Sequence, residues 1–251
     1  MMLALITATR DSMATLPSAL ESVEDVRGRI KLFFVDNDST DGTTPFLQSY
    51  VQSERNSVLL SQEGTGLYQA LNQGIRAAIQ DPEVTHIGLL HSDDILIPDA
   101  YSKYLMRIEE TGALVFYSDI QFHNLAGRQV RTWDSGRFSR FKLSTGWMPP
   151  HTSVIVAKEV YEKIGLYNPD FGTAADYEWV VRVYSELGEQ SRYVPESTLS
   201  MLVGGASSSG LRARLRANAM DGKVWADKSR LQGILVRICK PLRKIGQFKL
   251  V

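Results

Sequence analysis

Two adjacent carboxylates, Asp93 and Asp94, follow an apolar run at residues 85–90. Neighbouring negative charges repel each other. A divalent cation relieves that repulsion, because Mg²⁺ and Mn²⁺ commonly bind one or two carboxylates together with substrate phosphates. Helix capping is the simpler alternative, since Asp94 or Asp99 could cap a helix expected to follow Pro98. The pair therefore predicts a metal site, with capping as the competing interpretation.

A second acidic group, Asp36 and Asp38 on either side of Asn37, follows the apolar run 30–35. A carboxylate here could accept a hydrogen bond from a nucleotide base or a ribose hydroxyl, although the same residues are typical of a turn. The segment also resembles a calcium-binding loop, but Leu47 stands where such a loop needs a bidentate Glu. The sequence leaves a ligand contact and a turn as alternatives.

Asp176 lies at the expected start of a helix over residues 174–187. The helix dipole favours an acid there, and a general base must lie where it can accept a proton, so Asp176 and Glu178 are both candidates. His151 follows two prolines, which hold its backbone stiffly. It is a candidate for contact with a phosphate or a metal, and ordinary packing is the alternative.

The elements that must position these side chains alternate between strand and helix through the first hundred residues. Such alternation predicts a parallel sheet covered by helices, which binds ligands at the carboxyl ends of its strands. The polar clusters TATRDS, DNDSTDGT and HSDD each follow an expected strand, so they should meet at one edge. The expected strands are 3–9, 30–35, 58–61 and 85–90, and the expected helices are 16–23, 45–53 and 66–79.

The second half of the chain is less regular, and it ends in a basic segment. The glycine- and serine-rich stretch 204–210 is expected to be flexible. From residue 212 to the end there are 11 Lys or Arg and two acids, so this part carries +9 and the first 211 residues carry −9. An anionic or phosphate-bearing partner and a solvated helical face are both compatible with that charge. Strands are expected at 113–118, 129–134 and 152–157, and helices at 158–164 and 174–187.

The composition is typical of a soluble globular protein, with 43% hydrophobic and 22% charged residues. Cys239 is the single cysteine, so an intrachain disulfide is impossible. The apolar start lacks the basic region of a secretory signal, and no stretch reaches the roughly 20 apolar residues of a membrane helix. GxGxxG, Walker A and GxSxG motifs are absent, which argues against dinucleotide binding, ATP hydrolysis and the usual serine hydrolases.

Six segments in this order resemble glycosyltransferase family 2, the inverting enzymes of the GT-A fold, over roughly residues 3–203. The resemblance implies an α/β fold with a Rossmann-like, mostly parallel central sheet flanked by helices. It implies a nucleotide-binding half at 1–100, an acceptor-binding half at 101–203 and a basic helical tail at 204–251. The segments are ALITATRDS, FFVDNDSTDGT, LYQALNQGI, LLHSDDILIP, PHTSVIVAKEVYEKIGLYNPDF and AADYEWVVR.

The same resemblance implies roles for individual residues. Thr7, Thr9 and Asp36 match positions that line the nucleotide base pocket. Asp93 and Asp94 match the DXD motif, which binds the metal, with Asp93 also on the donor, and Asp176 matches the general base. The sequence departs from the family pattern at three positions and also lacks the QxxRW motif of processive polymerases, which favours addition of a single sugar. The departures are His91 and Gln69, which replace acids, and Ala175, which replaces Glu, while Arg182 matches a recurrent arginine of open role.

The predicted reaction is inverting transfer of a sugar from a nucleoside diphosphate sugar, with a UDP-sugar favoured, in cell-surface polysaccharide biosynthesis. The acceptor is a hydroxyl of a glycan or a lipid-linked sugar, the cofactor is Mn²⁺ or Mg²⁺, and no nucleic acid takes part. The predicted location is cytoplasmic, with the basic tail available for the inner face of the membrane, for packing or for a second subunit. A sugar nucleotidyltransferase and an inactive binding relative are the alternatives, although TATRDS lacks the glycine-rich loop expected of the former.

Overall fold

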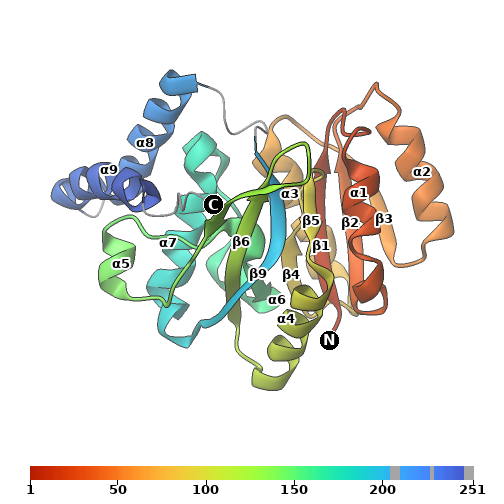
Figure 1. The fold of residues 1–251 in the computed structure, drawn as a ribbon, viewed down its shortest axis with the longest axis horizontal. Coiled ribbons are helices and arrows are strands. Elements are labelled where there is room, and N and C mark those ends of the chain that lie inside the picture. Colours follow the sequence, from red (N-terminus) through yellow and green to blue (C-terminus); the bar gives the residue numbers. More distant parts are fainter. Residues whose placement is uncertain (204–209, 227–228, 246–251) are drawn as a thin grey trace.

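The computed structural model describes residues 1–203, 210–226 and 229–245 (Figure 1). These residues form a nine-stranded sheet in the order β3-β2-β1-β4-β8-β6-β9-β5, with β7 paired to β6. The strands are β1 Leu3–Thr9, β2 Ile30–Asp36, β3 Ser57–Ser61, β4 His86–Leu89, β5 Asp94–Leu96, β6 Val115–His123, β7 Gln129–Trp133, β8 Ile155–Ala157 and β9 Arg192–Leu202.

Helices cover both faces of the sheet (Figure 1). The α-helices are α1 Leu16–Glu21, α2 Thr43–Ser53, α3 Leu67–Gln80, α4 Pro98–Thr111, α5 Arg140–Ser144, α6 Lys158–Ile164, α7 Ala175–Leu187, α8 Gly210–Ala226 and α9 Arg230–Ile245. Short 3₁₀ helices lie at η1 Glu24–Arg29, η2 His151–Ser153, η3 Pro169–Ala174 and η4 Gly188–Gln190.

The first four strands in space, β3, β2, β1 and β4, are all parallel. Thr9 at the end of β1 is in register with Asp36 at the end of β2, and Leu89 at the end of β4 pairs with Ile6. The polar segments that follow these three strands therefore emerge at one edge of the sheet. The sequence prediction of a shared edge is confirmed for all three.

Strand β1 explains why the first half reads as continuous apolar runs. Leu3 and Leu5 pack in a core with α1 and α4, whereas Ala4 and Ile6 pack in a second core with α3 and α7. A strand covered on both faces has no side that can be polar. Helix α3 lies so close to β1 that a Cβ added at Gly74 would overlap the side chain of Ile6.

The other half of the sheet is mixed, because β8 runs antiparallel to both β4 and β6, and β5 runs antiparallel to β9. Strand β9 lies parallel to β6 and had no counterpart among the expected strands. Asp94 was expected in a loop, but it begins β5 and pairs with Met201 of β9. The prediction of a mostly parallel sheet therefore holds for the half that carries β1 and β2.

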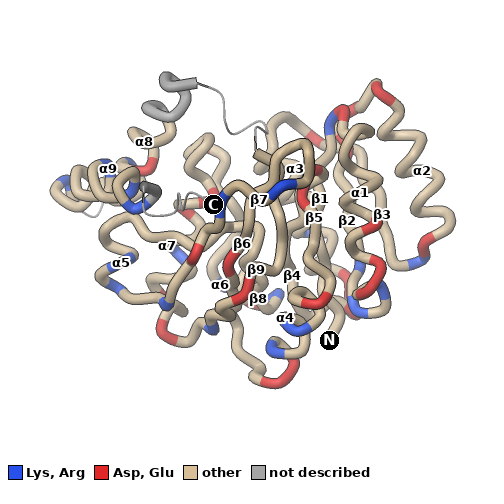
Figure 2. Tube along the Cα trace, viewed as in Figure 1, with Lys and Arg blue, Asp and Glu red and all other residues tan. Residues whose placement is uncertain are grey.

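Helices α8 and α9 form a hairpin beside α7 and η3, at the left of Figure 1. The indole Nε1 of Trp225 in α8 donates a hydrogen bond to the Tyr177 hydroxyl at 2.9 Å. Lys and Arg positions recur along α9, which contains no Asp or Glu (Figure 2). Within the described part of the chain, no helix is long and apolar enough to cross a membrane. The stretch 204–209, expected to be flexible, lies outside the described residues.

Candidate active site

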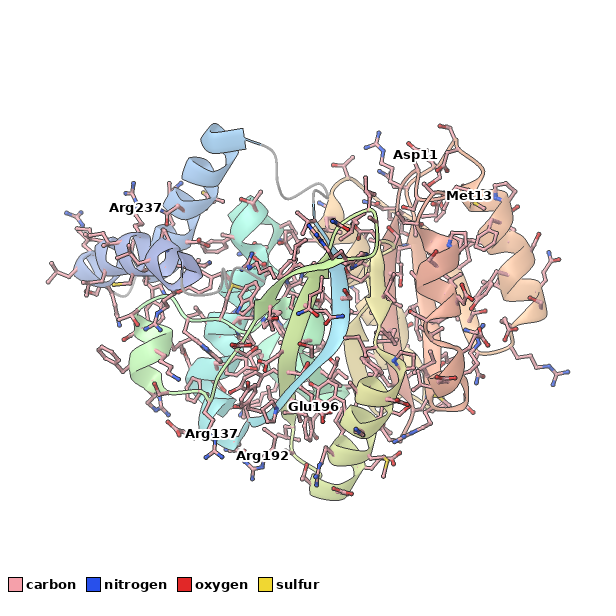
Figure 3. All side chains as sticks on the ribbon, viewed as in Figure 1. Asp11, Met13, Arg137, Arg192, Glu196 and Arg237 are labelled. Atoms are coloured by element: carbon pink, nitrogen blue, oxygen red, sulfur yellow. The ribbon has the colours of Figure 1, made fainter. Side chains whose placement is uncertain are left out.

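The loops after β1 and β2 are joined to each other by reciprocal hydrogen bonds. The backbone N–H of Asp11 donates to Ser39 Oγ at 2.9 Å, and Asp11 Oδ1 accepts from the N–H of Thr40 at 2.8 Å. The N–H of Met13 donates to Asp41 Oδ2 at 2.8 Å. Asp11 and Met13 lie at the top of the sheet in Figure 3. The two loops thus form one ordered rim over the carboxyl ends of β1 and β2.

Asp36 organises this rim from below. Its Oδ1 accepts hydrogen bonds from Thr9 Oγ1 at 2.8 Å and Ser39 Oγ at 2.6 Å. Its Oδ2 accepts from Ser39 N at 3.1 Å and Thr44 Oγ1 at 2.7 Å. Burial acts to raise the pKa of Asp36, but the hydrogen bonds outweigh it and hold the pKa below its usual value. Asp36 is therefore an ionised carboxylate in a shell of protein donors.

The hydroxyls and the carboxylate of Asp36, Thr9 and Thr7, expected to line the base pocket, are all enclosed by protein groups in this structure. A carboxylate offers about four acceptor positions, and all four of Asp36 are taken by protein groups, so none is left for a base N–H. The Thr9 hydroxyl is one of those donors. The Thr7 hydroxyl is enclosed, with no hydrogen-bond partner among the described residues. Asp36 and Thr9 thus bond within the rim, and in this arrangement none of the three residues presents a polar atom to a ligand.

His91, His151 and Asp176 come together although the chain separates them widely. The Nε2 atoms of His91 and His151 are 3.1 Å apart, and His151 Nδ1 lies 3.6 Å from Asp176 Oδ2. Burial, and then the proximity of His151, lower the pKa of His91 to about 3, so this imidazole is neutral. His151 thus lies between the segment after β4 and the start of α7. The sequence singled out each of the three residues but gave no sign of this order.

Asp176 keeps an accessible carboxylate at the first turn of α7, with 18% of its side chain exposed. Its Oδ1 accepts from the N–H of Tyr177 at 2.7 Å. Tyr68 of α3 lies against it: burial, then the charge of Asp176 and a hydrogen bond to it, raise the pKa of the Tyr68 phenol. Tyr68 was missed in the sequence, where nothing local links α3 to α7.

Glu178, the other candidate base, is used differently. Arg182 donates to both of its carboxylate oxygens, from Nε at 2.7 Å and Nη2 at 2.9 Å. The same guanidinium donates to the carbonyls of Ile164 and Leu166. The role of Arg182 was left open by the sequence. Glu178 orients its guanidinium, and the guanidinium holds the end of α6 against α7. Of the two acids, only Asp176 lies beside the histidines.

A separate cavity of about 300 Å³ opens beside α3 and does not include any of these residues. It is polar, and Arg76 is the basic side chain in its lining. None of the residues expected to bind the donor lies along it. The lining residues are Glu63, Gln69, Asn72, Gln73, Arg76 and Pro169.

Comparison with known proteins places this arrangement in a family. The sequence model described as Glycosyl transferase family 2 matches residues 4–159, more than half of the chain. The chain belongs to glycosyl transferase family 2. The match covers β1 through β8, and so the rim, the segment after β4 and His151.

Two curated glycosyltransferases illustrate the similarity. The glycosyltransferase Rv1514c of Mycobacterium tuberculosis is 29% identical over 187 residues, which cover 70% of this chain and 66% of that protein. A PGL/p-HBAD biosynthesis glycosyltransferase of Mycobacterium bovis is 24% identical over 196 residues, covering 77% of this chain and 73% of that protein. The chain thus spans about two thirds of the first relative's length.

Solved structures share the fold. S. aureus TarS in complex with UDP-GlcNAc superposes with a TM-score of 0.68 at 14% identity, covering 98% of this chain and 73% of that chain. The mannosyltransferase PcManGT from Pyrobaculum calidifontis, in complex with GDP-Man and Mn²⁺, gives a TM-score of 0.63 at 13% identity, covering 96% and 71%. The predicted GT-A type α/β fold is confirmed.

The segment expected to match the DXD motif offers one accessible carboxylate. Asp93 is partly exposed and makes no hydrogen bond or ion pair with the rest of the described chain, so it fits a hard divalent cation that also binds phosphates. Asp94 is completely buried, and neither of its oxygens has a hydrogen-bond partner in the part of the chain that the structure describes. Burial, and then the charge of Asp93, raise the pKa of Asp94 well above its usual value. The expected pair of ligands is therefore divided, with Asp93 the one that fits.

Over the described residues, no group of three or more His, Cys, Asp or Glu side chains is arranged to hold a metal by itself. A site completed by the substrate needs fewer protein ligands, because Mg²⁺ commonly keeps waters and binds through one or two carboxylates and the phosphates. The imidazoles of His91 and His151 lie close to this segment.

Proposed function

We propose that this family-2 chain is an inverting, metal-dependent glycosyltransferase that uses Asp176 as its general base. The observation that carries this proposal is the position of Asp176, an accessible carboxylate beside His151. His151 in turn contacts His91, which lies two residues before Asp93 in the sequence. Proton acceptance and donor binding are thereby brought to neighbouring points at one edge of the sheet.

The reaction needs one proton transfer and one displacement. Asp176 accepts the proton of the acceptor hydroxyl, and that oxygen bonds to the anomeric carbon of the donor sugar. The bond between that carbon and the diphosphate oxygen breaks on the opposite face, so the configuration inverts and a nucleoside diphosphate leaves. A partly exposed carboxylate is suited to accept the proton, and Asp176 forms no ion pair with an arginine among the described residues, whereas Glu178 does.

His151 positions the base. With Nδ1–H directed toward Asp176 Oδ2, its Nε2 accepts from the Nε2–H of neutral His91, and this tautomer fits both distances. Both ring nitrogens of His151 are engaged in this arrangement, so a donor phosphate, the contact expected from the sequence, would reach an N–H of His151 only when one of these two contacts opens. His91 then fixes the imidazole plane of His151 from the donor side.

Asp93 would hold Mn²⁺ or Mg²⁺ and contact the donor, and Asp94, buried beside it, is the second acid of the expected pair. Such an ion, when bound, neutralises charge on the leaving diphosphate. The rim ordered by Asp36 and Thr9, with Thr7 buried in β1 beneath it, forms the wall against which the nucleotide base lies. A UDP-sugar is the favoured donor, since TarS, with the same fold, binds UDP-GlcNAc, while PcManGT keeps GDP-sugars as the alternative.

The acceptor is a hydroxyl of a glycan or of a lipid-linked sugar in cell-surface polysaccharide biosynthesis. This assignment is supported by the similarity to the succinoglycan biosynthesis protein ExoO of Rhizobium meliloti, which is 27% identical over 141 residues, covering 56% of this chain and 39% of that protein.

The test is thermal unfolding with UDP, GDP, CDP and dTDP, each with Mn²⁺ and with EDTA. Stabilisation by one nucleotide that requires the metal is the expected result, because a ligand that binds only the native state raises its stability. The matching sugar nucleotide is then incubated with a candidate acceptor, and NMR of the product gives the anomeric configuration. Equal stabilisation with EDTA would overturn metal dependence, and retention of configuration would overturn the single displacement.

A further inference from the structure

Helix α9 presents five large apolar side chains to solvent along one face. Their spacing of three, four and seven residues places them in a single row, which we call the α9 stripe. Their exposed fractions range from 49% to 75%. The sequence left open whether such residues pack on the body of the protein, and for these members the structure shows that they do not. The α9 stripe consists of Leu231, Ile234, Leu235, Ile238 and Leu242.

The opposite face of α9 is firmly docked. Val236 and Lys240 are buried, and Lys240 Nζ lies 2.7 Å from Asp221 Oδ1 and 3.6 Å from the centroid of the Tyr177 ring. Helices α8 and α9 touch through glycines, since a Cβ on Gly233 would lie 2.8 Å from the carbonyl oxygen of Gly222. The α9 stripe therefore faces outward because its other side is already occupied.

The charge around the α9 stripe is positive. Arg230 and Arg237 are exposed, and they lie on the same flank of the row, about 80–120° from its centre at the 100° that each helical residue turns. Arg237 projects from the hairpin at the left of Figure 3. The segment from 212 onward carries 11 basic and two acidic residues. An apolar row bordered by cations is the pattern of a helix that lies in the interface of an anionic membrane.

We propose that the α9 stripe docks the protein on an anionic lipid surface. Two copies of this chain are a poorer occupant, because a two-fold interface of antiparallel α9 helices centred on the row would place the arginine-bearing flank of one copy beside that of the other. A bilayer of anionic lipid instead accepts the apolar row among its acyl chains and pairs the arginines with headgroups.

Docking through α9 would also hold the active site at the membrane. Trp225 of the hairpin is bonded to Tyr177, the residue that follows Asp176. A membrane contact on one side of the hairpin is thus linked by a short, packed path to the start of α7. The proposal itself concerns lipid binding and stands whether or not the chain transfers a sugar to a lipid-linked acceptor.

The test is co-sedimentation of the full chain with vesicles of phosphatidylcholine alone or with added phosphatidylglycerol. We expect binding to the anionic vesicles that weakens as salt is raised. The double variant Ile234→Ser and Ile238→Ser should lower the partition coefficient about tenfold or more, since it removes two exposed apolar side chains. Leu125→Ser is the matched control, because Leu125 is 91% exposed and lies outside the hairpin.

Both variants change exposed residues, so thermal unfolding should show folded proteins in each case. Equal binding by the wild type and the double variant would overturn the proposal, as would failure of the wild type to bind either vesicle. A dimer of the wild type in light scattering that the double variant converts to a monomer, without lipid binding, would assign the α9 stripe to a second copy of the chain instead.

Discussion

The imidazole of His151 faces the carboxylate of Asp176, with Nδ1 3.6 Å from Oδ2. This separation is longer than a hydrogen bond, so a small movement of either side chain closes it. His91 contacts the other ring nitrogen of His151 and limits how the ring can turn. Asp176, the proposed general base, is therefore oriented from the side on which the donor is expected to lie.

Replacing His151 by Ala should lower kcat about 10- to 100-fold, because a base displaced by about 1 Å loses its alignment with the acceptor hydroxyl. The unfolding temperature and the affinity for the nucleoside diphosphate should change little. His151→Gln should recover part of kcat, since its amide can donate to Asp176. Steady-state kinetics with varied acceptor separate kcat from KM. Equal losses in the Ala and Gln variants would speak against a positioning role.

Asp176→Asn removes the proton acceptor and keeps the shape of the side chain. We expect kcat to fall about 10²- to 10⁴-fold, the usual range for loss of general base catalysis. Stabilisation by nucleotide and metal should remain, because Asp176 does not hold the donor. Asp170→Asn is the control, since Asp170 is exposed in η3 and close in sequence. Turnover near the wild-type rate in Asp176→Asn would exclude Asp176 as the base.

Asp36→Asn should destabilise the native state by about 2–4 kcal/mol, because an amide accepts fewer hydrogen bonds than a carboxylate and leaves buried hydroxyls unpaired. Urea unfolding measures this loss. Asp38→Asn is the control: Asp38 is exposed at a φ of 48°, which Asn also adopts, so little change is expected. A loss no greater than that of the control would contradict the role of Asp36 in the rim.

The pH dependence of the same pair follows from the lowered pKa of Asp36. The unfolded chain binds a proton more readily at this residue than the native state does, so the stabilisation from ionised Asp36 is complete above the unfolded pKa, near 3.8. It is lost as pH falls through the lower native pKa. The stability difference between wild type and Asp36→Asn should therefore shrink below about pH 4, and a constant difference would contradict it.

Local signals explain what the sequence predicted of the fold. Strands β1, β2 and β4 are buried on both faces and end at clusters of turn residues, so each is visible in a short window. Strand β9 is not recognisable from a short window of sequence, because RYVPESTLSML mixes polar residues with a proline. It forms through long-range pairing with β6. Strand β5 depends on β9 in turn.

The candidate site divides in the same way. Single residues such as Asp176 and His151 stand out by type and position, but the contact between His151 and His91 joins residues sixty positions apart and needs the whole sheet. The pair of Glu178 and Arg182 has the four-residue spacing of neighbours on a helix, so that contact was predictable from α7 alone. Asp36 could either bond to its own loop or remain free for a nucleotide base. The orientation of the side chains decides between the two, and the spacing of residues in the sequence does not give that orientation.

The division of Asp93 from Asp94 gives a final prediction. Asp93→Asn should weaken Mn²⁺-dependent binding of the nucleotide about tenfold or more, since it removes the accessible charged ligand. Asp94→Asn should weaken this binding far less, because Asp94, the first residue of β5, has its carboxylate oxygens buried in the protein. Titration calorimetry of the nucleoside diphosphate at fixed Mn²⁺ compares the two isosteric variants under one condition. Equal loss in both would mean that Asp94 turns outward when the metal binds, and the ligand pair expected from the sequence would then be restored.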